Sequence, residues 1–88
     1  NYSSDELFEI ALQMYAQREY ELSSHCRWKL KCYLDEFVSK SHPHSGNARY
    51  IRNLVEKSIR LQAMRIIDKE FYSKKDLMTI EVSDLPLT

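Results

Sequence analysis

The sequence predicts an all-α domain, with three main helices in a small bundle followed by short C-terminal helical turns. Its 88 residues hold one glycine and two prolines, where average usage would give roughly ten of the two together. Few turn residues favour few turns and long helices over a β-sandwich or barrel. Apolar residues also recur at helical spacing in three stretches. A chain of this length forms one domain with a thin core.

The first helix is predicted over residues 4–18. Ser3 suits the N-cap position, and Glu6 three residues later completes a capping box. The inner stripe of this helix consists of Leu7, Ile10, Ala11 and Met14.

A break at residues 18–22 separates the first helix from the second. Tyr20 and Leu22 alternate with Glu21, which predicts a very short extended stretch. Ser23 then caps a helix over residues 24–40. This helix ends before Pro43, because the residue preceding a proline is driven out of the α region. Its expected inner stripe is Cys26, Leu30, Tyr33 and Phe37, with Leu34 beside it.

The third helix is predicted to be the longest, over residues 48–70, and Gly46 or Asn47 can cap it. Its inner side carries Ile51, Val55, Ser58, Gln62 and Ile66, flanked by Leu54 and Ile59. Its opposite side carries Arg49, Asn53, Glu56 and Arg60.

The C-terminal residues predict short pieces. Residues 73–77 suit one helical turn, and the alternation that follows predicts a strand over 79–82. A lone strand needs a partner, so a two-stranded parallel pairing of residues 20–22 with 79–82 is expected. Ser83, Asp84 and Leu85 suit the cap of a last turn.

The composition excludes several classes of protein. Thirteen basic residues balance thirteen acidic ones, whereas a nucleic-acid binder of this size is usually basic. No apolar run approaches the ~20 residues that cross a membrane. The lone glycine, Gly46, cannot build a glycine-rich phosphate loop, so no complete nucleotide site is expected within the chain. The chain begins at Asn1 and ends at Thr88, which suggests a piece of a larger protein.

Cysteines, histidines and carboxylates predict neither a disulfide, a metal site nor a catalytic pair. On one helix Cys26 and Cys32 would be ~9 Å apart along the axis, beyond the ~7 Å limit for a disulfide. Reduced thiols indicate a cytoplasmic protein. His42 and His44 flank a proline without a third ligand at metal-site spacing. The carboxylates sit at positions typical of solvated helix faces, so no catalytic residue is expected here.

Trp28 lies off the predicted inner stripe of the second helix. A tryptophan there either covers a second packing face or marks a contact with another body. The sequence leaves both interpretations open.

Arg49 lies in the first turn of the third helix, pointing away from its core. A helix N-terminus offers free N–H groups and a partial positive charge, and arginine adds a planar donor fork. Together they favour an anion such as phosphate. A solvated basic helix face is the alternative.

The segment 46–65 resembles the C-terminal lid of one branch of AAA+ ATPases, the branch of the stage V sporulation protein K type, the red-type Rubisco activases and the type VII secretion ATPases. The resemblance is carried by Gly46-Asn47-Ala48-Arg49, Arg52-Asn53, Glu56-Lys57-Ser58-Ile59-Arg60 and Gln62-Ala63-Met64-Arg65. Weaker likeness extends over nearly the whole chain, at Tyr2-Ser3, Glu6-Leu7, Tyr20–Leu22, Asp76-Leu77, Thr79-Ile80 and Asp84-Leu85.

The resemblance implies a lid that closes over ATP and Mg²⁺ held mainly by a larger α/β domain of the same chain, with neighbouring subunits in a hexameric ring and an unknown protein substrate. The second-sensor role, contact with the nucleotide phosphates, carries over to Arg49, in a turn with Gly46 and Asn47. Arg52, Arg60 and Trp28 become candidates for interfaces. Because the chain lacks a phosphate loop and Walker B acid, no activity is expected of it alone.

Two other kinds of function remain as alternatives to an ATPase lid. A stand-alone helical module could bind a protein partner through the Trp28 face without any nucleotide. The arginines of the third helix would also suit a DNA recognition helix, but zero net charge fits that interpretation poorly.

Overall fold

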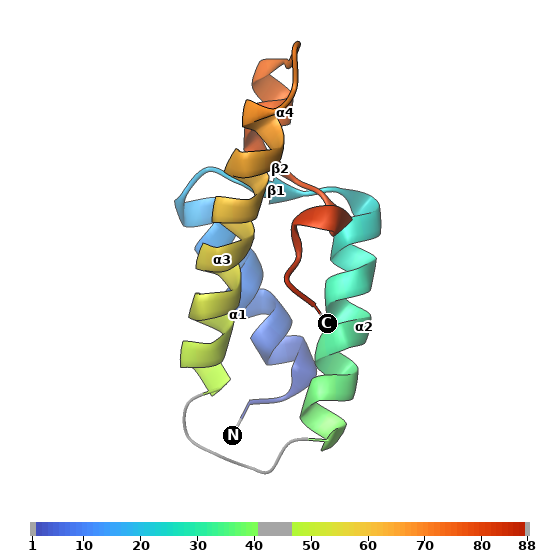
Figure 1. Ribbon diagram of the computed structural model, residues 1–88. Coiled ribbons are helices and arrows are strands. Elements are labelled where there is room, and N and C mark those ends of the chain that lie inside the picture. The colour runs from blue at the N-terminus through green and yellow to red at the C-terminus, as the bar shows by residue number, and fades with distance from the viewer. Residues whose placement is uncertain (1, 41–46, 88) are drawn as a thin grey trace.

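A computed structural model describes residues 2–40 and 47–87 and shows three long helices side by side (Figure 1). The predicted mostly-α fold is confirmed. The elements in chain order are α1 (Ser4–Gln17), β1 (Glu21–Leu22), α2 (Ser24–Lys40), α3 (Asn47–Ile67), α4 (Lys74–Met78), β2 (Thr79–Ile80) and the 3₁₀ turn η1 (Val82–Asp84).

Helix α1 packs against both α2 and α3, and η1 packs against α2 and α3. Figure 1 shows α2 running antiparallel to the other two helices, so the N-terminal ends of α1 and α3 lie at the same end of the bundle as the C-terminal end of α2. The apolar core fills the space between these elements. Its buried members are Leu7, Ala11, Tyr15, Leu22, Cys26, Leu30, Leu34, Ile51, Leu54, Val55, Ile80 and Leu85.

The predicted caps of the first two helices are present. The Ser3 hydroxyl accepts from the Glu6 N–H at 3.1 Å, and Glu6 Oε1 accepts from the Ser3 N–H at 2.8 Å. The Ser23 hydroxyl accepts from the Cys26 N–H at 3.2 Å. Between these helices the chain reverses at Glu19, whose φ of 65° is the left-handed conformation that ends a helix.

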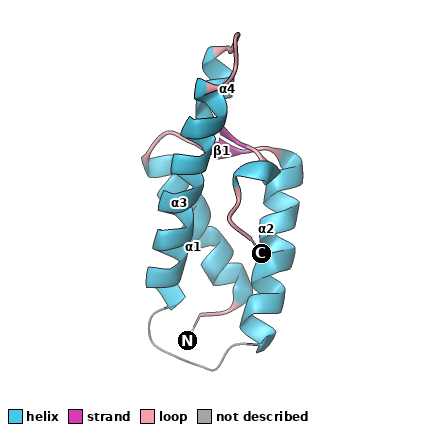
Figure 2. Ribbon diagram, viewed as in Figure 1, coloured by secondary structure: helices cyan, strands magenta, loops and turns pink. Residues whose placement is uncertain are grey.

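The two-stranded parallel pairing predicted from the sequence is confirmed but is shorter than expected. Glu21 pairs with Thr79 and Leu22 with Ile80, so residues 20, 81 and 82 lie outside the strands. Figure 2 shows this pair as a small magenta element among the helices. Because the pairing joins segments nearly sixty positions apart, it ties the C-terminal residues to the break between α1 and α2.

Other details also differ from the sequence prediction. Helix α3 ends at Ile67 instead of residue 70. The fully buried stripe of α2 is Cys26, Leu30 and Leu34, whereas Tyr33 and Phe37 are only partly buried. In α1, Tyr15 takes a central position that the periodicity did not single out, and its hydroxyl shares a 2.5 Å hydrogen bond with Ser58 of α3.

The domain is elongated, with principal extents of 44 × 24 × 19 Å. The long axis arises because the end of α3 and the residues up to α4 project beyond the other helices (Figure 1). Both cysteines are free thiols, as expected; Cys26 is buried and Cys32 exposed. Among the residues described, no helix is both long and apolar enough to span a membrane.

Candidate functional site

Arg49 lies on the solvent side of the first turn of α3. It forms no ion pair with any residue in the described part of the chain. The first turn of α3 contains no acidic residue. By contrast, the first turn of α1 at the same end of the bundle carries Asp5 and Glu6. The positive end of α1 is therefore already matched by carboxylates, whereas the first turn of α3 carries an exposed guanidinium and no acidic residue.

Asn47 is partly buried and is already helical, so it belongs to the first turn of α3 instead of preceding the helix as its cap. Gly46, His42 and His44 lie outside the described residues.

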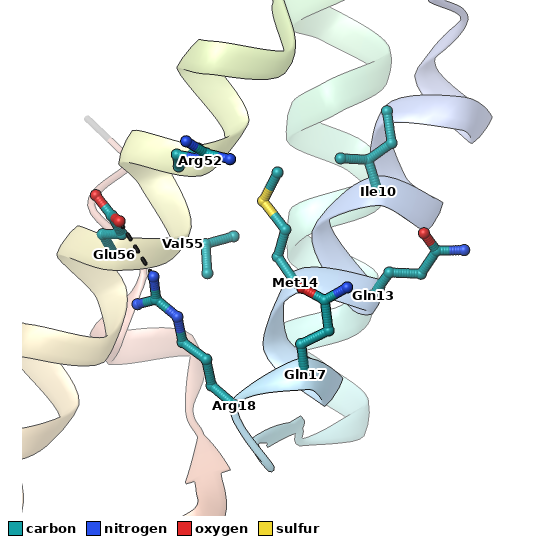
Figure 3. Close-up of a pocket in the computed structure, with 8 residues that line it drawn as sticks. All are labelled: Ile10, Gln13, Met14, Gln17, Arg18, Arg52, Val55 and Glu56. Atoms are coloured by element: carbon teal, nitrogen blue, oxygen red, sulfur yellow. Dashed lines mark hydrogen bonds and ion pairs between the residues drawn. The ribbon is translucent and has the colours of Figure 1, made fainter.

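A groove of about 400 Å³ runs between α1 and α3 (Figure 3). Its apolar lining comes from Ile10, Met14 and Val55. The rim is polar, and Arg52 reaches over it from the turn of α3 that follows Arg49. The other polar lining residues are Gln13, Gln17, Arg18 and Glu56. Such a groove offers apolar contact below and hydrogen-bond donors above.

One end of the groove is closed by an ion pair between Arg18 at the end of α1 and Glu56 of α3, at 3.1 Å. Glu56 was predicted to lie on the solvated face of the third helix; its carboxylate is partly shielded from water and pairs with Arg18. Both partners remain well exposed to water, so the pair contributes less than about 1 kcal/mol to stability. Its effect is to leave Arg52 as the free cation of the groove among the described residues.

The other sequence-predicted contact residues lie apart from Arg49. Arg60 is exposed on the same side of α3, eleven residues or ~16 Å further along the helix. Trp28 is 61% exposed on α2, with the His25 ring 6.0 Å away. Trp28 therefore does not cover a second packing face among the residues that the structure describes. Of the two interpretations of Trp28, contact with another protein or domain is the one left open.

Two polar contacts that the sequence analysis did not assign hold the C-terminal segment to α3. The Gln62 side-chain amide donates to the carbonyls of Asp76 and Leu77 at 3.1 and 3.0 Å. The Arg65 guanidinium binds both carboxylate oxygens of Asp84, at 2.9 and 3.0 Å. We call these five residues, Gln62, Arg65, Asp76, Leu77 and Asp84, the C-terminal clasp. A polar residue on an apolar inner stripe, as Gln62 is, signals such a partner because buried polar groups are hydrogen-bonded.

Metal ligands do not gather in the part of the chain that the structure describes. No three His, Cys, Asp or Glu side chains there come close enough to hold an ion.

Comparison with known proteins places these features in a family. The sequence matches the AAA lid domain family over residues 3–88. It is 48% identical over 88 residues to stage V sporulation protein K of Bacillus subtilis (strain 168), covering 99% of this chain and 27% of that protein. It is 34% identical over 87 residues to a CfxQ homologue of Galdieria sulphuraria, covering 97% and 28%. It is 35% identical over 66 residues to protein CbbX of Cereibacter sphaeroides, covering 75% and 21%.

The chain thus spans about a quarter of the length of these relatives. The family match covers nearly all of it, including the turn of Arg49 and the C-terminal clasp. The chain therefore belongs to the AAA lid domain family of the AAA+ ATPases.

Proposed function

We propose that this chain is the single lid domain of a longer, cytoplasmic AAA+ ATPase and that it closes over ATP bound to an ATPase domain of the same protein. In this proposal Arg49 contacts the nucleotide phosphates, with Asn47 and Gly46 in the same turn. The observation that carries it is the first turn of α3, where an exposed guanidinium and a helix N-terminus lie together without any acidic residue. ATP supplies the phosphoryl group, and Mg²⁺ would be held mainly by the ATPase domain.

Arg49 would make the lid sensitive to the state of the nucleotide. Contact between a guanidinium and a terminal phosphate exists before hydrolysis and is lost afterwards, so closed and open lids differ in free energy between the two states. The rest of the domain would move with Arg49, because α1 packs on both other helices and the C-terminal clasp holds residues 76–84 to α3. Hydrolysis would thereby be coupled to motion of the whole lid.

The α1–α3 groove and the exposed arginines provide surfaces for the remaining partners. Arg52 at the groove is well placed for the ATPase domain that shares the nucleotide with Arg49. Arg60 and Trp28 are candidates for contact with a neighbouring subunit. Contacts between different surfaces of identical subunits close into rings, so we propose a ring, hexameric as the resemblance implies, that remodels a protein substrate.

Arg49→Ala is expected to lower the rate of ATP hydrolysis by the full-length protein by about 10²- to 10³-fold, since it removes one positioned donor from the transferring phosphoryl group. The control is Arg27→Ala, which removes an exposed arginine from α2 at the other end of the bundle and should leave the rate unchanged. Steady-state turnover measures both. Equal rates for the wild-type protein and Arg49→Ala would refute the sensor assignment.

The proposal also predicts the sequence encoded upstream of Asn1. A strand followed by G-x-x-x-x-G-K-[ST], and then an acidic Walker B strand, should lie within the preceding ~200 codons, because the lid alone lacks every part of a phosphate loop. A start codon directly before Asn1 would contradict the proposal.

A stand-alone interaction module is the second candidate function, and the exposure of Trp28 is the observation that favours it. Under this alternative, Trp28→Ala should abolish capture of a protein partner, because exposed tryptophans are frequent binding hot spots. It should leave ATP turnover of the full-length protein unchanged. His25→Ala, which removes only the neighbouring ring, is the matched control. Loss of turnover in Trp28→Ala would instead place Trp28 at an interface of the ATPase itself.

A further inference from the structure

Three aromatic side chains join the C-terminal half of α2 to the first turn of α3. The Tyr50 ring stacks on Phe37, with centroids 4.6 Å apart and planes within 8° of parallel. Phe37 in turn lies 6.2 Å from the ring of Tyr33. The hydroxyls of Tyr33 and Tyr50 share a hydrogen bond. We call Tyr33, Phe37 and Tyr50 the aromatic cluster. Phe37 stacks on both tyrosine rings, and the two tyrosines are also joined by their hydroxyl hydrogen bond.

The aromatic cluster packs against the first turn of α3, the part of the helix that its own hydrogen bonds stabilise least. The first turn of a helix lacks acceptors for its own N–H groups and frays readily. Among residues 47–50 none is fully buried, and the first residue of α3 that lies in the core is Ile51. Further along the two helices, η1 packs against both α2 and α3 (Figure 1). At the end that carries Arg49, the aromatic cluster therefore links α2 directly to α3 within the part of the chain that the structure describes.

Two anchors on different sides fix the rotation of a helix about its axis. Ile51 is buried in the core, and Tyr50, about 100° away around the helix, stacks on Phe37 of α2. Arg49 precedes Tyr50 by one residue and follows any rotation of this turn. The end of a helix side chain lies at least about 5–6 Å from the helix axis, so a rotation of about 20° would move it by about 2 Å or more. A misplacement of about 1 Å at a reacting group can cost as much as about 10²-fold in rate.

We propose that Tyr50 is a positioning residue for Arg49: by stacking on Phe37 and bonding to Tyr33, it sets the direction in which Arg49 leaves the lid. This inference rests on the proposed phosphate contact of Arg49. Burial, reinforced by the bond to Tyr33, raises the pKa of Tyr50 above its ordinary value. Tyr50 thus stays neutral, and able to keep this bond, at any physiological pH.

A double-mutant cycle between Tyr50 and Arg49 tests the proposal in the full-length protein, with kcat for ATP hydrolysis as the readout. Tyr50→Ala should lower kcat about 10-fold when Arg49 is present and less than about 2-fold in the Arg49→Ala background, because interacting residues are non-additive. Tyr50→Phe keeps the stacked ring and should retain most of the rate. A residue that only supports the fold would lower kcat by the same factor in both backgrounds.

Tyr20→Ala is the matched control. Tyr20 is also a partly buried tyrosine packed on the core, but it lies at the other end of the bundle from Arg49. It should leave kcat unchanged. Thermal melting of each variant shows whether it is folded at the assay temperature. Should Tyr50→Ala be unfolded, Tyr50→Leu and Phe37→Leu, which keep apolar bulk but remove the stack, take its place in the cycle.

The outcomes separate this inference from the proposed function. If Arg49→Ala lowers kcat and the Tyr50 effect disappears in its background, the positioning role is supported. If Arg49→Ala lowers kcat but Tyr50 variants have no effect, or the same effect in both backgrounds, the positioning role is overturned while the sensor assignment stands. If Arg49→Ala leaves kcat unchanged, both fall, whatever the Tyr50 variants do.

Discussion

Arg65→Met is expected to lower the free energy of unfolding by about 3 kcal/mol, the low end of the range measured when one partner of a buried ion pair is removed, because the Arg65 side chain is itself 27% exposed. Asp84 is 1% exposed, so its carboxylate would be left buried without its guanidinium. The same change releases one side of the C-terminal clasp. An 88-residue domain has a total stability of about 4–13 kcal/mol. Urea denaturation followed by circular dichroism should therefore show a variant that has lost a large fraction of its stability.

Arg18→Met is the matched control for this prediction. It removes an arginine that also binds a carboxylate, Glu56 at 3.1 Å, but at a site where both partners face water. Its cost should stay below about 1 kcal/mol. Replacing both partners together, as Arg65→Met with Asp84→Leu, should recover most of the loss because no buried charge then remains. Equal costs for Arg65→Met and Arg18→Met would show that the C-terminal clasp does not anchor the domain.

The helices and the strand pairing were predictable because local rules determine them. Capping residues such as Ser3 and Ser23 mark helix starts, and the inner stripe of α3, including the polar Ser58 and Gln62, follows from its period. The end of α3 was placed three residues too late. Beyond Ile67 the chain projects past the bundle, so no packing supports further turns whatever the local propensity.

Contacts between distant segments were not predictable from periodicity. Tyr33 and Phe37 were assigned to the buried stripe of α2, but they lie on the side that meets the first turn of α3 and stay partly exposed. Similarly, Asp84 was predicted to help cap a last turn and Arg65 was given no contact within the fold, and nineteen positions separate the two. A single sequence says which residues are polar or apolar but not which partner satisfies each one.

The candidate site likewise has one feature that the sequence predicted and others that depend on contacts between helices. The exposed position of Arg49 follows from its place opposite the inner stripe, and the structure agrees. The groove lined by Arg52, and the aromatic cluster beside Arg49, depend on how α1 and α2 meet α3. These required the assembled fold.

Raising the pH from 9 to 12 is expected to destabilise the domain by several kcal/mol through two buried groups. Burial, with smaller contributions from the nearby carboxylates of Asp84 and Glu81, raises the pKa of Cys26 from 9.0 to about 12. Burial likewise raises the pKa of Tyr15 from 10.0 to about 12, against a smaller lowering by its bond to Ser58. Both folded-state values exceed the unfolded ones, so their stabilisation is fully present below pH 9 and is lost as the pH rises towards 12. The losses amount to about 4 kcal/mol for Cys26 and about 3 kcal/mol for Tyr15.

Three variants assign this alkaline loss to its sources. Cys26→Ala removes the thiol; it costs about 1 kcal/mol at pH 7 through the small cavity it leaves, but its stability should fall much less steeply between pH 9 and 12. Tyr15→Phe keeps the ring, loses about 1 kcal/mol with the Ser58 bond, and should flatten the slope above pH 10. Cys32→Ala changes an exposed thiol and should reproduce the wild-type curve. Chemical denaturation at each pH measures all four proteins. A wild-type slope in Cys26→Ala would mean that water reaches Cys26 before the domain unfolds, since a solvated thiol ionises at its ordinary pKa in both states.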